Sequence, residues 1–163
     1  MPAFRPQDLP SFSRLTWLMG LYGENYQRIA RLLDLRALDR PGAWVSGAGN
    51  GLDLMVEVLE VHAYTLELKI SYRMADPVTG QPDPSAFVRI YRDARQAEVT
   101  HCYVGRHWQD ALGLHPSPKV MFGHRLRMNS FLNKWLEYLL AQGHGPASLL
   151  PFADEDEPSL AIA

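Results

Sequence analysis

The alternation of apolar and polar residues between residues 52 and 73 constrains the fold of this chain most. Apolar side chains recur at every second position on both sides of a short break: Leu52, Leu54, Val56 and Val58, then Leu66, Leu68, Ile70 and Tyr72. This period is typical of strands that bury one face and expose the other. The two runs therefore predict an antiparallel hairpin with a single buried face.

Helical periods flank this region on both sides. Apolar residues at helical spacing predict one helix over residues 13–35 and a second over 125–142. A short strand is expected at 44–45, and a second hairpin is expected from strands at 87–92 and 96–103. We therefore predict an α+β fold: an antiparallel sheet of about five strands with both long helices packed on one face. Because strands and helices do not alternate, a doubly wound nucleotide-binding fold is not expected.

The apolar stripe of the second predicted helix identifies part of the core. Leu132 and Trp135 lie on this stripe, and Leu139 continues it one turn further on. We therefore expect Leu132 and Trp135 to be largely buried against the sheet.

Length and composition bound the class of protein. The chain of 163 residues fits one domain, which we place at residues 1–143, and the acidic stretch Asp154–Glu157 marks 144–163 as a disordered tail. A net charge of −2 gives no general attraction to nucleic acid or to an anionic membrane. Cys102 is the single cysteine, and neither a signal peptide nor an apolar run of membrane-spanning length is recognisable. We therefore expect a cytoplasmic protein.

Charge pairing predicts the register of the first hairpin. A loop over residues 61–63 would place Glu57 opposite Glu67, where like charges destabilise the pairing. A longer loop over 61–65 places Val58 opposite Leu68 and Glu57 opposite Lys69, which brings opposite charges together. We therefore predict the longer loop. In that register the acids of this hairpin form ion pairs across the strands and do not form a catalytic dyad.

The second hairpin carries the strongest candidate for a binding surface. Arg89, Tyr91 and Asp93 alternate with apolar residues and point to one face, and a tight turn at residues 94–95 would place Tyr91 beside Glu98. The same turn would place Arg89 beside Thr100. The cluster is either a solvent-exposed ion pair of small energetic value or a surface that binds a phosphate or a carboxylate. The sequence leaves both interpretations open.

Asn25 is the one polar residue on the apolar stripe of the first helix. A buried amide without hydrogen-bond partners costs about 1–3 kcal/mol, so this side chain needs partners. It either bonds to the sheet backbone and fixes the docking of the helix, or it lines a pocket. We favour the structural role.

The histidines and the cysteine do not predict a metal centre or a nucleophile. His101, His107, His115 and His124 fall in one region, but their spacings match no known ligand pattern. His101 and Cys102 are neighbours on a strand and therefore point to opposite faces. We predict no metal, no cofactor and no catalytic residue from these positions.

Several segments together resemble one protein family. Residues 21–26 (LYGENY), 64–65 (YT), 89–99 (RIYRDARQAEV) and 129–136 (NSFLNKWL) resemble the YqiB-like family, a bacterial family classed as domain of unknown function 1249. The resemblance covers residues 12–143, and 89–99 is its most specific part. Some members are encoded beside a cyclic-nucleotide phosphodiesterase and an ADP-ribose pyrophosphatase, which suggests nucleotide metabolism. The family places an acidic, acidic, basic triplet before the last helix, where this chain has Gly123-His124-Arg125.

Two functional hypotheses follow from the sequence. The first is a non-catalytic binding or regulatory module that acts through a protein partner or through self-association. The alternative is a small-ligand-binding protein or an enzyme that acts on a nucleotide or another anionic metabolite. A closed interface between the helices and the sheet favours the first, and a deep pocket with convergent polar groups favours the second.

Overall fold

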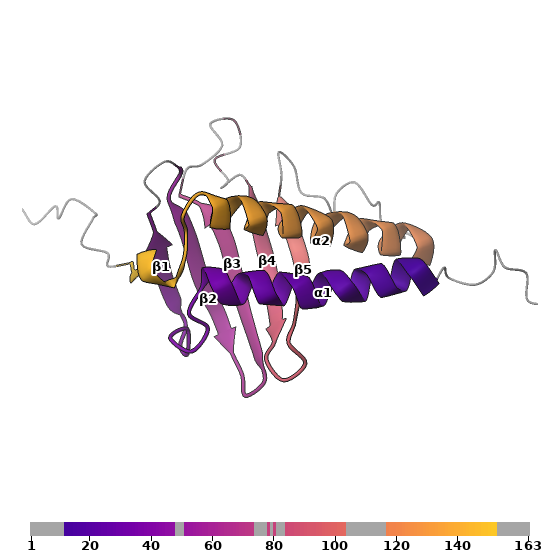
Figure 1. Cartoon of the computed structure of the whole chain (residues 1–163), viewed down its shortest axis with the longest axis horizontal. Coiled ribbons are helices and arrows are strands. Elements are labelled where there is room, and N and C mark those ends of the chain that lie inside the picture. The colour runs from indigo at the N-terminus through magenta and orange to yellow at the C-terminus, as the bar shows by residue number, and fades with distance from the viewer. Residues whose placement is uncertain are drawn as a thin grey trace, which may run out of the picture.

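The protein is a six-stranded antiparallel sheet covered on one face by two long helices. A computed structural model describes residues 12–47, 51–73, 78, 80, 84–103 and 117–152. The elements are α1 (Phe12–Leu32), β1 (Gly42–Ser46), β2 (Leu54–Val61), β3 (Thr65–Tyr72), β4 (Ser85–Tyr91), β5 (Gln96–Tyr103), α2 (Pro118–Ala141), the short 3₁₀ helix η2 (Pro146–Ser148) and β6 (Leu149–Pro151). Figure 1 shows both helices lying across the same face of the sheet. The predicted α+β class is confirmed, with six strands in place of about five.

The helix α2 begins earlier than the sequence analysis predicted. Its first residue is Pro118, because the Ser117 hydroxyl accepts a hydrogen bond from the Val120 amide at 3.3 Å and proline fits the first turn of a helix. The predicted start near residue 125 is therefore wrong. The N-terminal halves of α1 and α2 extend past β5, as Figure 1 shows, so both helices project beyond that edge of the sheet.

The sheet contains one strand that the sequence analysis missed. The strand order is β5-β4-β3-β2-β1-β6, and β6 pairs with β1 through Ser46 opposite Leu149 and Trp44 opposite Pro151. This strand is only three residues long and ends in proline, so it has no alternation to detect. The folded region therefore extends past the predicted boundary at residue 143, to Phe152. Residues 153–163 of the predicted tail lie outside the described residues.

The predicted register of the first hairpin is confirmed over most of its length. Val58 lies opposite Leu68, Val56 opposite Ile70 and Glu57 opposite Lys69. The predicted five-residue loop is wrong, because the register shifts between Val58 and Glu60 and the ladder then continues to Val61 opposite Leu66. Leu59 is the extra residue of this bulge. As a result Glu60, and not Glu57, lies opposite Glu67.

The second hairpin turns over a longer loop than the sequence analysis predicted. Tyr91 lies opposite Gln96 and Arg89 lies opposite Glu98, so the predicted pairs Tyr91–Glu98 and Arg89–Thr100 are each displaced by two residues. The turn spans residues 92–95 and places Arg95 at a positive φ of 53°. A second register shift between Phe87 and Val88 leaves Thr100 as an extra residue in β5.

The core lies between the sheet and the helices. The alternating residues of β2, β3 and β4 point into it, and α2 contributes Leu132, Trp135 and Leu136. Trp135 is 5% exposed and donates a hydrogen bond from Nε1 to the Tyr72 hydroxyl at 3.1 Å. The predicted burial of Leu132 and Trp135 is confirmed. Within the described residues, neither helix combines the length and the apolar character that crossing a membrane requires.

Candidate functional site

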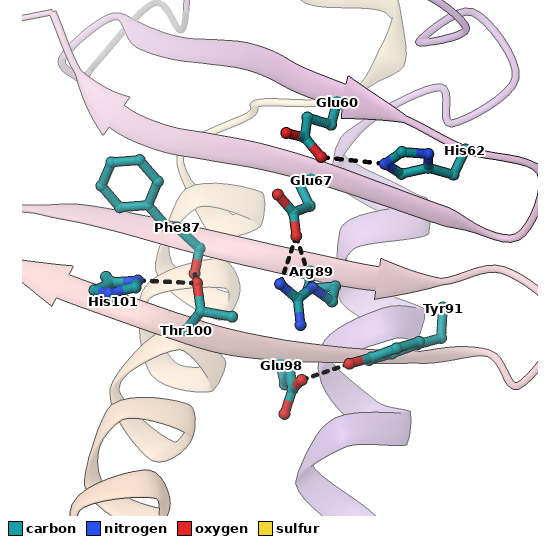
Figure 2. A network of polar contacts seen from close by, with 9 residues as sticks. All are labelled: Glu60, His62, Glu67, Phe87, Arg89, Tyr91, Glu98, Thr100 and His101. Atoms are coloured by element: carbon teal, nitrogen blue, oxygen red, sulfur yellow. Dashed lines mark hydrogen bonds and ion pairs between the residues drawn. The ribbon is translucent and has the colours of Figure 1, made fainter.

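Polar side chains from three adjacent strands form a cluster on the face of the sheet that the helices leave uncovered. We call Glu67, Arg89, Tyr91 and Glu98 the open-face cluster. Figure 2 looks onto this face, with both helices behind the strands. Backbone pairing sets Arg89 between Glu67 of β3 and Glu98 of β5. The cluster therefore results from strand register, which brings Glu67 of β3 into one row with the residues of the second hairpin.

Arg89 and Glu67 form the central ion pair of the open-face cluster. Arg89 donates from Nε at 2.7 Å and from Nη2 at 2.6 Å to the same oxygen, Oε1 of Glu67. The hydrogen bond to Glu67, with a smaller contribution from Tyr91, raises the pKa of Arg89. The two side chains are 42% and 30% exposed, so the pair contributes about 0–1 kcal/mol to stability. The ion pair therefore orients the guanidinium group more than it stabilises the fold.

Tyr91 and Glu98 form the second contact of the open-face cluster. The Tyr91 hydroxyl donates to Oε1 of Glu98 at 2.6 Å. Burial, followed by the hydrogen bond to Glu98, raises the pKa of Tyr91, and Arg89 opposes this shift. The predicted proximity of Tyr91 and Glu98 is thus present, although it arises from a diagonal contact and not from direct pairing.

A shallow hollow with an aromatic wall lies next to the open-face cluster. Its volume is about 370 Å³, and its lining includes Leu59, Phe87, Arg89 and His101. The Phe87 ring makes an edge contact with His101, and the ammonium group of Lys69 lies 5.5 Å from the ring centroid. Leu59 is exposed at the bulge of β2. The open face therefore combines oriented charges with exposed apolar surface.

The two opposed acids of the first hairpin do not form a proton-sharing pair. Glu60 accepts from Nε2 of His62 at 3.1 Å, whereas Glu67 accepts from Arg89. Figure 2 shows each carboxylate directed toward its own partner. The two carboxylates therefore do not share a proton in this arrangement.

The other two predicted site residues lie apart from the open-face cluster. Asp93 is exposed at the hairpin turn, where its Oδ1 accepts from the Ala94 amide at 2.9 Å and so stabilises the turn. Asn25 is buried on the helix side of the sheet, with no exposed surface. The structure therefore brings together Arg89, Tyr91 and Glu98 and separates them from Asp93 and Asn25.

Asn25 joins the two helices. Its Nδ2 donates to the Asn129 carbonyl at 3.3 Å, and its Oδ1 accepts from Nδ2 of Asn133 at 3.1 Å. The bond to the sheet backbone that the sequence analysis considered for Asn25 is made instead by Asn129, whose Oδ1 accepts from the Val99 amide at 3.0 Å. Val99 lies in the edge strand β5, so Asn129 satisfies an amide of the sheet edge.

A small pocket connects the open-face cluster to the helices at the β5 edge. We call it the β5-edge pocket, and its volume is about 230 Å³. Its lining comes from the strands and from α2: Arg89, Glu98, Val99, Thr100, Met121, His124, Arg125 and Met128. Burial, followed by Arg127 and Arg125, lowers the pKa of His124. The pocket thus contains two arginines and a histidine whose neutral form is favoured.

Tyr22 of α1 belongs to the same region. Burial, followed by the Glu98 carboxylate, raises the pKa of Tyr22, and Arg125 opposes this shift. Tyr22, Glu98 and Arg125 come from α1, β5 and α2 respectively. The β5 edge is therefore the place where the polar groups of the sheet meet those of both helices.

Sequence reasoning missed Glu67, His124 and Arg125 as members of this region. Glu67 reaches Arg89 only because β3 pairs with β4, and the sequence carries no charge pattern that shows this pairing. His124 fell before the predicted start of the last helix and Arg125 fell at that start, whereas both lie inside α2. The Ser117-Pro118 sequence is a helix-start signal that would have corrected this placement.

A serine and a histidine pair at the opposite edge of the sheet. The hydroxyl of Ser46 lies 2.7 Å from Nδ1 of His144, and Nε2 of His144 lies 3.2 Å from the Leu52 carbonyl. A serine close to a histidine is a possible nucleophile and base. Ser46 is 2% exposed and His144 is 3% exposed, so a substrate has no access to the pair. The contact joins the segment after α2 to β1 and is structural.

The histidines considered as metal ligands do not gather in the described part of the chain. His107 and His115 lie outside the described residues, His101 is exposed on the open face, and His124 is buried in α2. In residues 12–47, 51–73, 78, 80, 84–103 and 117–152, no group of three or more His, Cys, Asp or Glu residues has metal-binding geometry.

The fold and the candidate site define a small α+β protein whose described helices cover one face of the sheet, while the other face carries an oriented ion-pair cluster. The chain belongs to the family described as protein of unknown function (DUF1249), whose model matches residues 28–145. This match covers strands β1 to β5, the C-terminal end of α1 and all of α2. Neither the curated proteins nor the solved structures contain a match to the chain.

Proposed function

We propose that this chain is a non-catalytic binding module that acts through protein contacts on its open face, either with a second copy or with a partner protein. The observation that carries the proposal is the hollow of about 370 Å³ beside the ion pair of Arg89 and Glu67. Tyrosine, arginine and other large side chains supply most of the binding energy of protein interfaces. Here such side chains are held in place by cross-strand contacts before any partner binds.

The arrangement of the two faces supports a surface function. The face under the helices is closed by a continuous apolar core, and its buried amides are bonded to one another. The open face carries Arg89, Phe87 and Leu59 at its surface, and Figure 2 shows both long helices on the other side of the strands. We also propose that the protein acts in the cytoplasm and is a bacterial member of the YqiB-like family, in line with the resemblance described above.

Site-specific photo-crosslinking tests this function. A photoreactive residue at Leu59 reports on the open face, and the same residue at the exposed Leu150 of β6 is the matched control. We expect a crosslinked product of defined mass from Leu59 and not from Leu150, in extracts of cells that contain the protein naturally. Arg89→Glu should suppress this product. Equal crosslinking from both positions would contradict the proposal.

The purified complex provides the quantitative test. The partner identified by its mass, or the second copy, is purified and its dissociation constant is measured against wild-type protein and Arg89→Glu. We expect Arg89→Glu to weaken binding by at least about tenfold, since it removes a positioned donor and places a third carboxylate between Glu67 and Glu98. An unchanged dissociation constant would show that the open face is not the binding surface.

A second function, the binding of a small anion, is supported by the β5-edge pocket. Arg89, Arg125 and His124 line this pocket together with Thr100. Its volume of about 230 Å³ lies below the roughly 300–1,000 Å³ of typical ligand pockets, which favours protein binding as the main function. Any tight ligand must raise the melting temperature by linkage. A thermal-shift series with nucleotides and inorganic phosphate, repeated with Arg125→Ala, would identify this activity.

A further inference from the structure

The outer surface of the helix layer carries a groove that differs in chemistry from the open face of the sheet. We call it the helix groove. It lies between α1 and α2, has a volume of about 820 Å³, and combines a basic rim with an apolar floor. The basic side chains are Arg14, Lys119, Arg127 and Lys134, and the apolar ones include Trp17, Val120, Leu126 and Phe131.

The helix groove is basic even though the whole chain has a net charge of −2. No acidic residue occurs in α1 before Glu24 or in α2 before Glu137. Of the four basic side chains, only Lys134 has an acidic residue within four positions on its own helix, at Glu137. Trp17 adds an apolar surface, because it is 58% exposed at the groove. A ligand for this groove has to be negatively charged and carry apolar groups.

The chain itself contains a segment with this chemistry. Residues 154–157 are four consecutive acids, and Leu160 and Ile162 follow them at a distance of a few residues. We propose that the helix groove binds the acidic segment 153–163 of a second copy of the chain. The acids meet the basic rim, and the leucine and isoleucine meet the apolar floor beside Trp17 and Phe131.

Reach restricts how far the four acids of the same copy can extend across the groove. Phe152 donates its amide to the Ala43 carbonyl, so the segment leaves the sheet beside β1. Asp154 to Glu157 lie two to five residues further on, which carries them at most roughly 7–18 Å from Phe152. Strand β5 is four strand spacings from β1, which is roughly 19 Å, and Arg127 lies in the part of α2 that contacts β5. A second copy has no such restriction.

The contact uses the opposite side of the molecule from the open face. It joins one surface of a copy to a different segment of the next, so it is a head-to-tail contact that produces rings or chains. It is independent of the proposed function, because Arg89→Glu should leave it unchanged. The failure of one proposal is therefore distinguishable from the failure of the other.

Peptide binding tests the proposal directly. A dye-labelled peptide with the sequence of residues 152–163 is titrated with the full chain, and fluorescence anisotropy reports binding. We expect saturable binding that weakens at high salt. The double variant Arg127→Glu with Lys134→Glu should weaken it by at least about tenfold. The matched control is Arg36→Glu with Arg40→Glu, which changes the charge equally at exposed positions after α1 and should have little effect.

Self-association of the full chain supplies a second readout. Sedimentation velocity is run in the Arg89→Glu background, which removes association through the open face. It compares the chain with its acids intact and the chain with Asp154→Asn, Glu155→Gln, Asp156→Asn and Glu157→Gln added, and only the chain with intact acids should associate as its concentration rises. An equal loss of peptide binding in Arg127→Glu with Lys134→Glu and in Arg36→Glu with Arg40→Glu would overturn the proposal. Association that survives the four amide substitutions would also overturn it. Tighter binding of a single-stranded oligonucleotide than of the peptide would identify a nucleic-acid surface instead and equally overturn it.

Discussion

The two faces of the sheet carry similar numbers of side chains but use them differently. On the covered face, residues such as Val56, Leu68 and Ile90 are buried against the helices and determine the fold. On the open face, Glu67 and Arg89 remain partly exposed and bond to each other across the strands. The comparison shows that alternate positions of the same strands face two different environments. One set packs into the core, and the other set lies at the surface, where it is accessible to a partner.

The difference extends to the polar groups on each side. On the covered side, Asn25 and Asn129 are fully buried. The Asn25 side chain bonds to the Asn129 carbonyl and to Asn133, and the Asn129 side chain accepts from the Val99 amide. A buried amide that loses its partner costs about 1–3 kcal/mol, whereas an exposed ion pair is worth about 0–1 kcal/mol. The shorter contact on the open face is therefore worth less than the buried ones, because it is partly exposed.

The largest expected effect is on the covered face, at Trp135. Trp135→Ala should lower the free energy of unfolding by about 3–5 kcal/mol, because it leaves a cavity in the core and removes the partner of the Tyr72 hydroxyl. Urea denaturation measures this change. Trp17→Ala is the matched control, because Trp17 is exposed. Equal losses for the two variants would show that the helix layer is not packed as described.

The next effect is expected at Asn129. Asn129→Ala should cost about 1–3 kcal/mol, because the buried Val99 amide loses its acceptor. Hydrogen exchange should show faster exchange of the Val99 amide together with lower global stability. Asn133→Ala, which removes only the bond to Asn25, should cost less. A reversed order would contradict the role of Asn129 at the sheet edge.

A smaller effect on stability is expected from pH, and it arises from two buried histidines. Burial, as the first cause, lowers the pKa of both His124 and His144 in the folded protein. Protonation therefore favours the unfolded state. Their contribution to stability is present above the unfolded pKa of about 6.5 and is lost as pH falls toward the lower folded values. Unfolding free energies measured across this range should decrease with falling pH, and His144→Gln should reduce the slope. A stability that rises on acidification would contradict the assignment.

The smallest effect on stability is expected on the open face. Arg89→Ala should change the free energy of unfolding by less than about 1 kcal/mol, because the ion pair with Glu67 is partly exposed. The double-mutant cycle with Glu67→Ala isolates the pair from other effects of each substitution. A coupling energy well above this range would mean that the cluster is a structural element of the sheet.

The covered face was largely predictable from the sequence, and the open face was predictable only in part. Burial imposes an alternation that is visible in Val56, Val58, Leu66 and Leu68, and charge pairing identified Glu57 opposite Lys69. The bulge at Leu59 was not predictable, because the residues of one strand do not show where its pairing with the next strand skips a residue. The register after it, with Glu60 opposite Glu67, followed from the bulge and was missed for the same reason.

The candidate site depended on pairings that no local pattern encodes. Arg89, Tyr91 and Glu98 were identified because they share one hairpin. Glu67 was missed because it joins them through the pairing of β3 with β4. His124 and Arg125 were missed because the start of α2 was placed too late, although Ser117 and Pro118 carried the signal. Asn25 was placed in the core, and its partner Asn129 bonds to the sheet.

The dissociation constant of the open-face complex in Arg89→Glu, compared with that in wild type, tests the central claim most directly. Arg31→Glu is the control, because Arg31 is exposed at the end of α1 and makes the same change of charge on the helix layer. The account predicts binding weakened by at least about tenfold in Arg89→Glu and little changed in Arg31→Glu. Binding equal to wild type in Arg89→Glu would contradict the claim that the open face of the sheet is the binding surface.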